Sequence, residues 1–171
     1  LTIKLFNWFY YHKAFTKNKQ AKANYDSFFF PLDAIKNWNR IYGKRGFTQY
    51  QFILPLESSF EGISQILTQI ADSGKGSFLA VLKLYGQANK NFLSFPMEGY
   101  SLALDFKIEK GIFELLDNLD KVVVQHGGRV YLSKDVRVTK EVFEKGYPML
   151  PDFKKLRNKF DLKDTLNSLQ S

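Results

Sequence analysis

The chain has 171 residues, of which 44% are hydrophobic and 25% charged, a balance typical of one folded domain. It contains no cysteine, which excludes disulfides, thiolate metal sites and cysteine nucleophiles, and its two histidines, His12 and His126, lie so far apart that we expect no metal site. The net charge of +8 favours an anionic partner (nucleic acid, a membrane surface or a phosphorylated ligand), although a solvated lysine-rich surface gives the same balance.

The first 15 residues are dense in aromatic side chains at helical spacing, notably Leu5, Trp8, Phe9 and His12. This pattern favours a helix packed into the core of a larger parent protein; a membrane-surface helix is the alternative. A polar linker is expected over 17–24. Because the chain opens on Leu1, we expect a piece of a longer protein, although a trimmed terminus would look the same. It has no apolar run long enough to span a membrane, so we expect this chain to be cytoplasmic or peripheral at the inner membrane.

From residue 33 onwards, segments with strand periodicity alternate with segments with helix periodicity. Asp33 is placed to cap one helix, and Ser58 with Glu61 forms a predicted capping box for the next. The order βαββαβ predicts an α+β fold, a ferredoxin-like antiparallel sheet with helices on one face and extra N- and C-terminal helices. The expected strands cover 47–54, 77–85, 100–108 and 129–133, and the expected helices cover 34–42, 59–73, 112–125, 140–145, 151–156 and 162–169.

Side chains alternate between the two faces of each expected strand. One face is apolar and suits the helices; it comprises Tyr50, Phe52, Leu54, Phe78, Ala80, Leu82, Leu84, Tyr100, Leu102, Leu104, Phe106, Val130 and Leu132. The other face collects Gln49, Gln51, Lys83, Tyr85, Ser101, Asp105 and Tyr131. A sheet with one solvated face would explain this second set, but its amides, phenols and small neighbours favour a ligand-binding surface.

Lys83 stands out because it interrupts the apolar strand LAVLKLYG. A buried ammonium needs an anion or solvent, and Asp105 on the neighbouring strand is the candidate partner. The alternative is that Lys83 donates to a substrate hydroxyl or phosphate oxygen.

Four strings in order identify a resemblance: FFFPLDAIKNWNRIYGKRGFTQYQFILP from Phe28, FLAVLKLYG from Phe78, LSFPMEGYSLALDF from Leu93 and GGRVYLSKDVRVT from Gly127. Together they resemble the C-terminal cap domain of the aldonolactone oxidase group of FAD-linked oxidases, within the vanillyl-alcohol-oxidase superfamily. The resemblance implies a cap domain over 28–171, preceded by a helix and linker over 1–27. It also implies that FAD is held mainly by an N-terminal FAD-binding domain that this chain lacks.

The resemblance further implies oxidation of a sugar CH–OH to a ketone by the whole enzyme, the fragment alone being inactive. The substrate would be a sugar or a polyprenyl-phosphate-linked sugar, with a separate reductase as a possible partner. The family's Tyr-x-x-Lys-Asp string corresponds to Tyr131, Lys134 and Asp135. In the family that lysine lies beside the flavin and the substrate, so Lys134 and Tyr131 are the expected catalytic and cofactor-contacting residues.

Gln49, Gln51 and Lys83 match pocket-lining residues of the family, and Tyr85 takes the place of a phenylalanine. With Ser101 and Asp105 they form the expected substrate-binding set. Where some members carry Asn and Cys, this chain has Ser101 and Ala103, so thiol-directed inhibitors should find no target here.

The competing class is a basic ferredoxin-like RNA-binding module, which the βαββαβ order and the charge would fit. Its third strand requires stacking aromatic residues, but here Leu102 and Asp105 stand in those places. Tyr100 also falls on the face assigned to the helices, so we expect no nucleic-acid partner.

Overall fold

The computed structural model describes residues 2–13, 20–30, 33, 36–134 and 137–160. The chain divides into two compact units, Leu1–Trp38 and Asn39–Ser171. The first unit contains helix α1 (Thr2–His12) and the short helix α2 (Tyr25–Phe29), whose first turn is capped by the Asn24 side chain. The expected helix at the N-terminus is therefore present, and its large side chains from Leu5 to Tyr11 are exposed.

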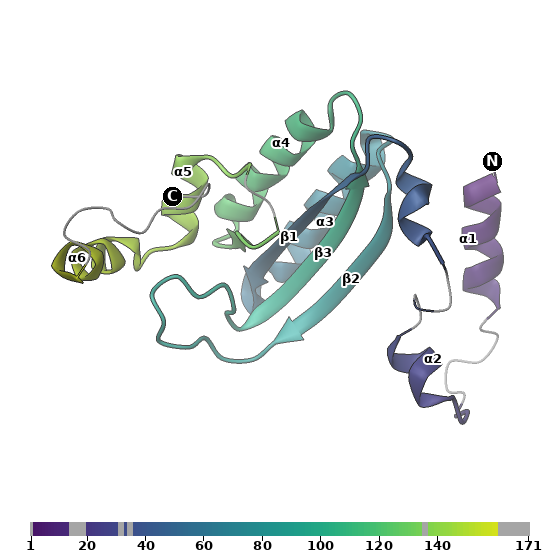
Figure 1. The fold of residues 1–171 in the computed structure, drawn as a ribbon, viewed down its shortest axis with the longest axis horizontal. Coiled ribbons are helices and arrows are strands. Elements are labelled where there is room, and N and C mark those ends of the chain that lie inside the picture. The colour runs from purple at the N-terminus through teal and green to yellow at the C-terminus, as the bar shows by residue number, and fades with distance from the viewer. Residues whose placement is uncertain (1, 14–19, 31–32, 34–35, 135–136, 161–171) are drawn as a thin grey trace. The chain divides into compact units, whose positions relative to one another are not determined.

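The second unit is built on one four-stranded antiparallel sheet in the order β2-β3-β1-β4 (Figure 1). Its strands are β1 (Phe47–Pro55), β2 (Ser77–Tyr85), β3 (Gly99–Lys107) and β4 (Arg129–Val130). Helix α3 (Leu56–Asp72) joins β1 to β2, and helix α4 (Ile112–Gln125) joins β3 to β4. The predicted ferredoxin-like α+β fold is thus confirmed.

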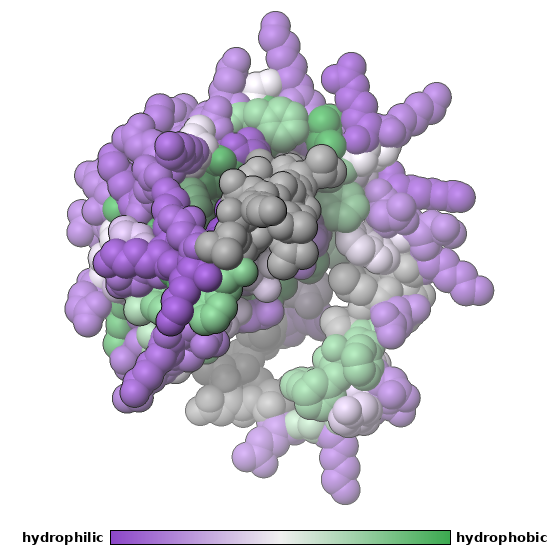
Figure 2. All heavy atoms as spheres, turned by 60° about the vertical axis from the view of Figure 1, so that its left-hand side comes forward, coloured by the Kyte–Doolittle hydropathy of each residue, from purple (hydrophilic) through white to green (hydrophobic). Residues whose placement is uncertain are grey.

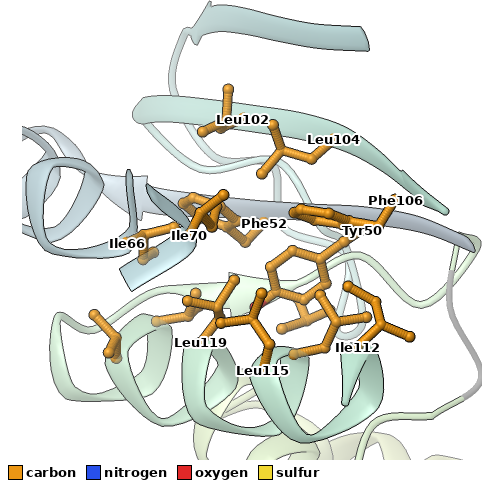
Figure 3. Close-up of a cluster of buried hydrophobic side chains, with 14 of the residues drawn as sticks. Tyr50, Phe52, Ile66, Ile70, Leu102, Leu104, Phe106, Ile112, Leu115 and Leu119 are labelled. Carbon is orange, nitrogen blue, oxygen red and sulfur yellow. The ribbon is translucent and has the colours of Figure 1, made fainter. Parts of the chain in front are cut away.

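The core lies between the sheet and helices α3 and α4 (Figure 3). Alternation along β1 turns Tyr50, Phe52 and Leu54 toward the helices, and each is fully buried. Residues at helical spacing on α3 and α4 meet them from the other side: Ile66, Ile70, Ile112, Leu115, Leu116, Leu119, Val122 and Val123. Burial of this apolar surface is the main force that holds the helices on this face of the sheet.

The chain after β4 closes the outer edge of the sheet. Helix α5 (Lys140–Gly146) is capped by the Thr139 hydroxyl and is followed by helix α6 (Leu150–Phe160). Between them the buried Tyr147 donates its hydroxyl to the carbonyl of Val130 in the edge strand, at 2.8 Å. The edge of β4 is thereby covered by the chain's own residues. The expected last helix over 162–169 lies outside the described residues.

Two local predictions prove wrong. Helix α3 begins at Leu56 after Pro55, without a side-chain cap, and Ser58 donates instead to the carbonyl of His126, so Ser58 and Glu61 form no capping box. The expected helix over 34–42 is a 3-10 helix over Trp38–Tyr42, within the described part of that range.

Strands β2 and β4 also depart from the expected pattern. The register of β2 shifts between Ser77 and Ala80, and the ring of Phe78 contacts that of Tyr42 edge-on at 5.4 Å. Phe78 therefore lies on the face away from the helices. Leu82 and Leu84 lie on the predicted face, but they are 56% and 64% exposed because no helix covers this edge strand. Strand β4 ends at Val130 rather than at 133.

The surface in the space-filling view carries many long hydrophilic side chains, in keeping with the net charge of +8 (Figure 2). No helix in the described part of the chain has the length and apolar character needed to cross a membrane.

Candidate functional site

The residues predicted from the strand pattern share the sheet face that the helices leave open. Register places Gln49 opposite Asp105, Gln51 opposite Ala103, and Lys83 opposite Ser101. The backbone amide of Tyr131 donates to the carbonyl of Gln51 at 2.8 Å, which continues the pairing of β4 by one residue and sets Tyr131 on the same face. The sheet thus brings residues from four segments to one surface.

A hydrogen-bonded chain runs across this face from a buried carboxylate to an exposed ammonium. Asp105 is only 3% exposed, and its Oδ1 accepts from Nε2 of Gln49 at 3.1 Å. The Oε1 atom of the same Gln49 amide accepts from Nζ of Lys134 at 3.3 Å. A turn positions Lys134, because its backbone amide donates to the carbonyl of Tyr131 at 3.2 Å. Asp135, the other residue of the family string, lies outside the described residues.

The second carboxylate oxygen of Asp105 faces Tyr42, whose hydroxyl donates to Oδ2 at a long 3.4 Å. Tyr42 is fully buried, and its ring stacks on that of Phe47 at 4.5 Å. Burial and the neighbouring Asp105 carboxylate raise the pKa of Tyr42 to about 12. The phenol therefore remains protonated near neutral pH and serves as a donor to the carboxylate.

Gln51 on β1 and Ser101 on β3 form a separate polar pair on this face. Nε2 of the buried Gln51 donates to the hydroxyl of Ser101 at 3.1 Å, and both residues are at most 5% exposed. Ser101 is therefore held in place by Gln51 on the neighbouring strand. Ala103, between Ser101 and Asp105, adds no polar group to the face.

The loop between β2 and β3 supplies an aromatic wall at one end of the face. Phe95 from this loop is 5% exposed and stacks on Tyr131, with 4.4 Å between the ring centroids. Tyr85 meets Phe95 edge-on at 6.2 Å. Nη1 of Arg129 fastens the loop by donating to the carbonyl of Ser94 at 2.8 Å, and burial lowers the pKa of this guanidinium.

Lys83 is exposed on the same face, and within the described residues its ammonium has no hydrogen-bond or ion-pair partner. The expected partner, Asp105, is instead engaged by Gln49 and Tyr42. Because Lys83 pairs in register with Ser101, it lies four residues along β3 from Asp105. The Lys83–Asp105 ion pair considered from the sequence is therefore not formed.

Sequence reasoning missed three residues that shape this face: Tyr42, Phe95 and Arg129. Tyr42 and Phe95 lie outside the main helices and strands, where alternation gives no signal. Arg129 holds the loop through the carbonyl of Ser94, a backbone atom that the sequence pattern does not locate.

The described residues contain no cluster of three or more His, Asp or Glu side chains that could hold a metal ion. A cleft of about 550 Å³ lies elsewhere, lined by residues of α4 and α5 and their surroundings, and includes none of the predicted site residues. The open sheet face therefore remains the candidate site.

These features define a class: a ferredoxin-like α+β domain covered by helices on one side, with an ordered polar and aromatic cluster on the other. The chain is 40% identical over 152 residues to the decaprenylphosphoryl-beta-D-ribose oxidase of Mycolicibacterium smegmatis, an alignment that covers 89% of this chain and 33% of that protein. The resemblance predicted from the sequence strings is thereby confirmed.

A second relative is an uncharacterized protein in the mprA 5' region of Streptomyces coelicolor. It is 37% identical over 100 residues, which cover 58% of this chain and 27% of that protein. No family model matches the chain. The chain thus spans about a third of the length of the curated relatives it matches.

Proposed function

We propose that this chain is the substrate-binding cap domain of an FAD-dependent oxidoreductase that oxidises a sugar CH–OH to a ketone. The observation that carries the proposal is the polar chain from Asp105 through Gln49 to Lys134 on the open sheet face. The identity to a decaprenylphosphoryl-ribose oxidase supports the assignment of an oxidase, and its restriction to a third of that protein supports a domain of a larger enzyme.

The open face offers suitable groups for a flavin edge and a sugar. FAD, when bound, supplies the electron acceptor for oxidation of the CH–OH carbon. Lys134 is exposed, and its ammonium donates one hydrogen bond to Gln49. The other N–H bonds of the ammonium can therefore donate to an anionic or hydroxyl-bearing ligand. A cation in that place stabilises negative charge that develops on a neighbouring group.

The sugar would lie along the same face. The aromatic wall of Tyr131, Phe95 and Tyr85 gives an apolar surface against which a pyranose or furanose ring can pack. Lys83, exposed and without a partner in the described structure, is suited to a phosphate oxygen of a polyprenyl-phosphate sugar. With a substrate of this kind, the whole enzyme would work at a membrane surface, as a peripheral protein, with a reductase to process its ketone product.

The test is anaerobic mixing of the full-length flavoprotein with candidate sugars and polyprenyl-phosphate sugars, followed by the loss of oxidised-flavin absorbance. We expect bleaching with at least one of them. Lys134→Ala should slow bleaching by about 100-fold or more, the scale of losing one preorganised electrostatic contact. The matched control, Lys110→Ala, removes an exposed lysine from the turn before α4 and should leave the rate unchanged. Absence of bleaching with every candidate would refute the proposed activity.

A further inference from the structure

The donor-to-acceptor direction of the hydrogen-bonded chain on the open face is set by Asp105 at its buried end. A carboxylate only accepts hydrogen bonds, so Asp105 requires donors on both of its oxygens. Tyr42 donates to Oδ2 and Nε2 of Gln49 donates to Oδ1. The amide of Gln49 must therefore turn its NH2 group toward Asp105, and its Oε1 faces Lys134 as a consequence.

The opposite orientation of the Gln49 amide would be unfavourable at both ends. Its Oε1 would then face the Asp105 carboxylate, where two acceptors meet, and its NH2 group would face the Lys134 ammonium, where two donors meet. The charged groups on either side therefore select one orientation of the amide.

We propose that Asp105 is a positioning residue that acts through Gln49, fixing the amide so that its Oε1 holds the Lys134 ammonium in place on the open face. This inference rests on the proposed function for the role of Lys134, but the contacts themselves do not require a substrate. Asp105 need not touch the ligand, since it is 3% exposed and both of its oxygens already have donors.

This arrangement orders the lysine without neutralising it. A direct ion pair with Asp105 would draw the ammonium toward the sheet and commit it to the carboxylate. The Gln49 amide instead connects Asp105 to Lys134 through two hydrogen bonds, of 3.1 and 3.3 Å. The ammonium is positioned by the amide oxygen, and its positive charge remains at the exposed end of the chain of hydrogen bonds. Lys134 thereby differs from Lys83, a lysine on the same face that has no hydrogen-bond partner among the described residues.

The test measures how fast Lys134 of the full-length protein reacts with an acylating reagent, by pulse labelling with N-hydroxysuccinimidyl acetate and peptide mass spectrometry. An ammonium held by Gln49 should react slowly. Asp105→Leu should raise the labelling rate of Lys134 by about threefold to tenfold, the effect of losing one oriented hydrogen bond. Lys83, labelled in the same sample, is the internal control and should not change.

The decisive comparison repeats Asp105→Leu in a Gln49→Leu background. If Asp105 acts through Gln49, it has no further effect there, because the mediating amide is already gone. Equal acceleration in both backgrounds, or no acceleration in either, would overturn the inference. Asp105→Asn, which keeps the shape of the side chain, is the second variant if the leucine variant does not fold; it should accelerate labelling by a smaller factor.

Flavin reduction gives an independent readout. Asp105→Leu should slow it while leaving the substrate dissociation constant within about threefold, and should add no loss to Lys134→Ala. If labelling responds as expected but no sugar reduces the flavin, the positioning role stands and the proposed function fails.

Discussion

Arg137 and Asp120 form a two-point ion pair against the core, with Nη1 to Oδ2 at 2.9 Å and Nη2 to Oδ1 at 3.0 Å. The Asp120 carboxylate is 1% exposed and also accepts from the hydroxyl of Tyr50 at 2.9 Å. The guanidinium contacts Asp117 as well, on the same helix. This network ties Arg137, in the segment after β4, to helix α4 and, through Tyr50, to strand β1.

Replacement of one member of this pair should be strongly destabilising. Asp120→Asn removes the buried negative charge that faces the Arg137 guanidinium at two points, and we expect a loss of about 3 kcal/mol in the free energy of unfolding. Denaturant titration monitored by circular dichroism measures it. The control, Asp72→Asn at the exposed end of α3, should change stability by less than about 0.5 kcal/mol. A loss as small as the control's would show that the pair does not hold this segment.

The two buried phenols predict a stability that falls at alkaline pH. Burial raises the pKa of both Tyr42 and Tyr147 to about 12 from an ordinary value of 10.0. A raised folded-state pKa contributes stability that is present below pH 10 and is lost as the pH rises through 12. Each phenol should contribute about 2 kcal/mol to the decline, seen in denaturant titrations across this range.

Substitution separates this effect from the titration of lysines. Tyr42→Phe and Tyr147→Phe should each flatten the decline above pH 10, whereas Tyr11→Phe, at a side chain that is 79% exposed, should leave it unchanged. An equal slope in all three variants would mean that the two phenols are not the titrating groups.

Gly99 begins β3 where the backbone of another strand passes very close. Its φ of +152° disfavours side chains, and a Cβ there would meet the carbonyl oxygen of Leu54 at 1.9 Å. Gly99→Ala should therefore lower the free energy of unfolding by about 3 kcal/mol or prevent folding. Gly86→Ala, in open space one residue after β2, should be nearly neutral. Thermal denaturation of both variants decides the matter, and equal melting temperatures would contradict the close approach.

The sequence predicted the elements of the sheet and its covering helices because their patterns are local. The bounds of β2 and α4 agree with the expected ranges 77–85 and 112–125, since alternation and helical spacing run through each without interruption. Phe78 was placed on the wrong face because the register shift after Ser77 moves one residue across the sheet, and alternation alone cannot reveal such a shift.

The site was predictable only in part, for a related reason. Strand alternation brings Gln49, Gln51 and Asp105 to one face, and the structure places them there. Which of them touch is decided by side-chain geometry across strands, so Asp105 meets Gln49 rather than Lys83. Tyr42 arrives from a 3-10 helix 63 residues away in sequence from its partner Asp105, a separation at which no periodicity operates.

The stacking of Phe95 on Tyr131 gives a last prediction, which rests on the proposed function of the open face. Its ring is stacked on Tyr131 and shields it from the loop side, so Phe95→Ala should leave Tyr131 without its supporting partner. If the full-length protein binds the proposed sugar substrate, its dissociation constant should rise about tenfold, together with a stability loss of about 2–3 kcal/mol from the vacated space. Binding titration and denaturant unfolding measure the two effects separately.

The matched variant is Phe92→Ala, three residues earlier in the same loop and only half-buried. It should lower stability less and leave substrate binding unchanged, because no ring contact of Phe92 with Tyr131 is present in the described structure. Phe95→Leu, which keeps apolar bulk but not the flat ring, should fall between the wild type and Phe95→Ala in affinity. If both alanine variants weaken binding equally, the loop affects binding only through its overall stability. The stacking of Phe95 on Tyr131 would then make no contribution of its own to ligand affinity.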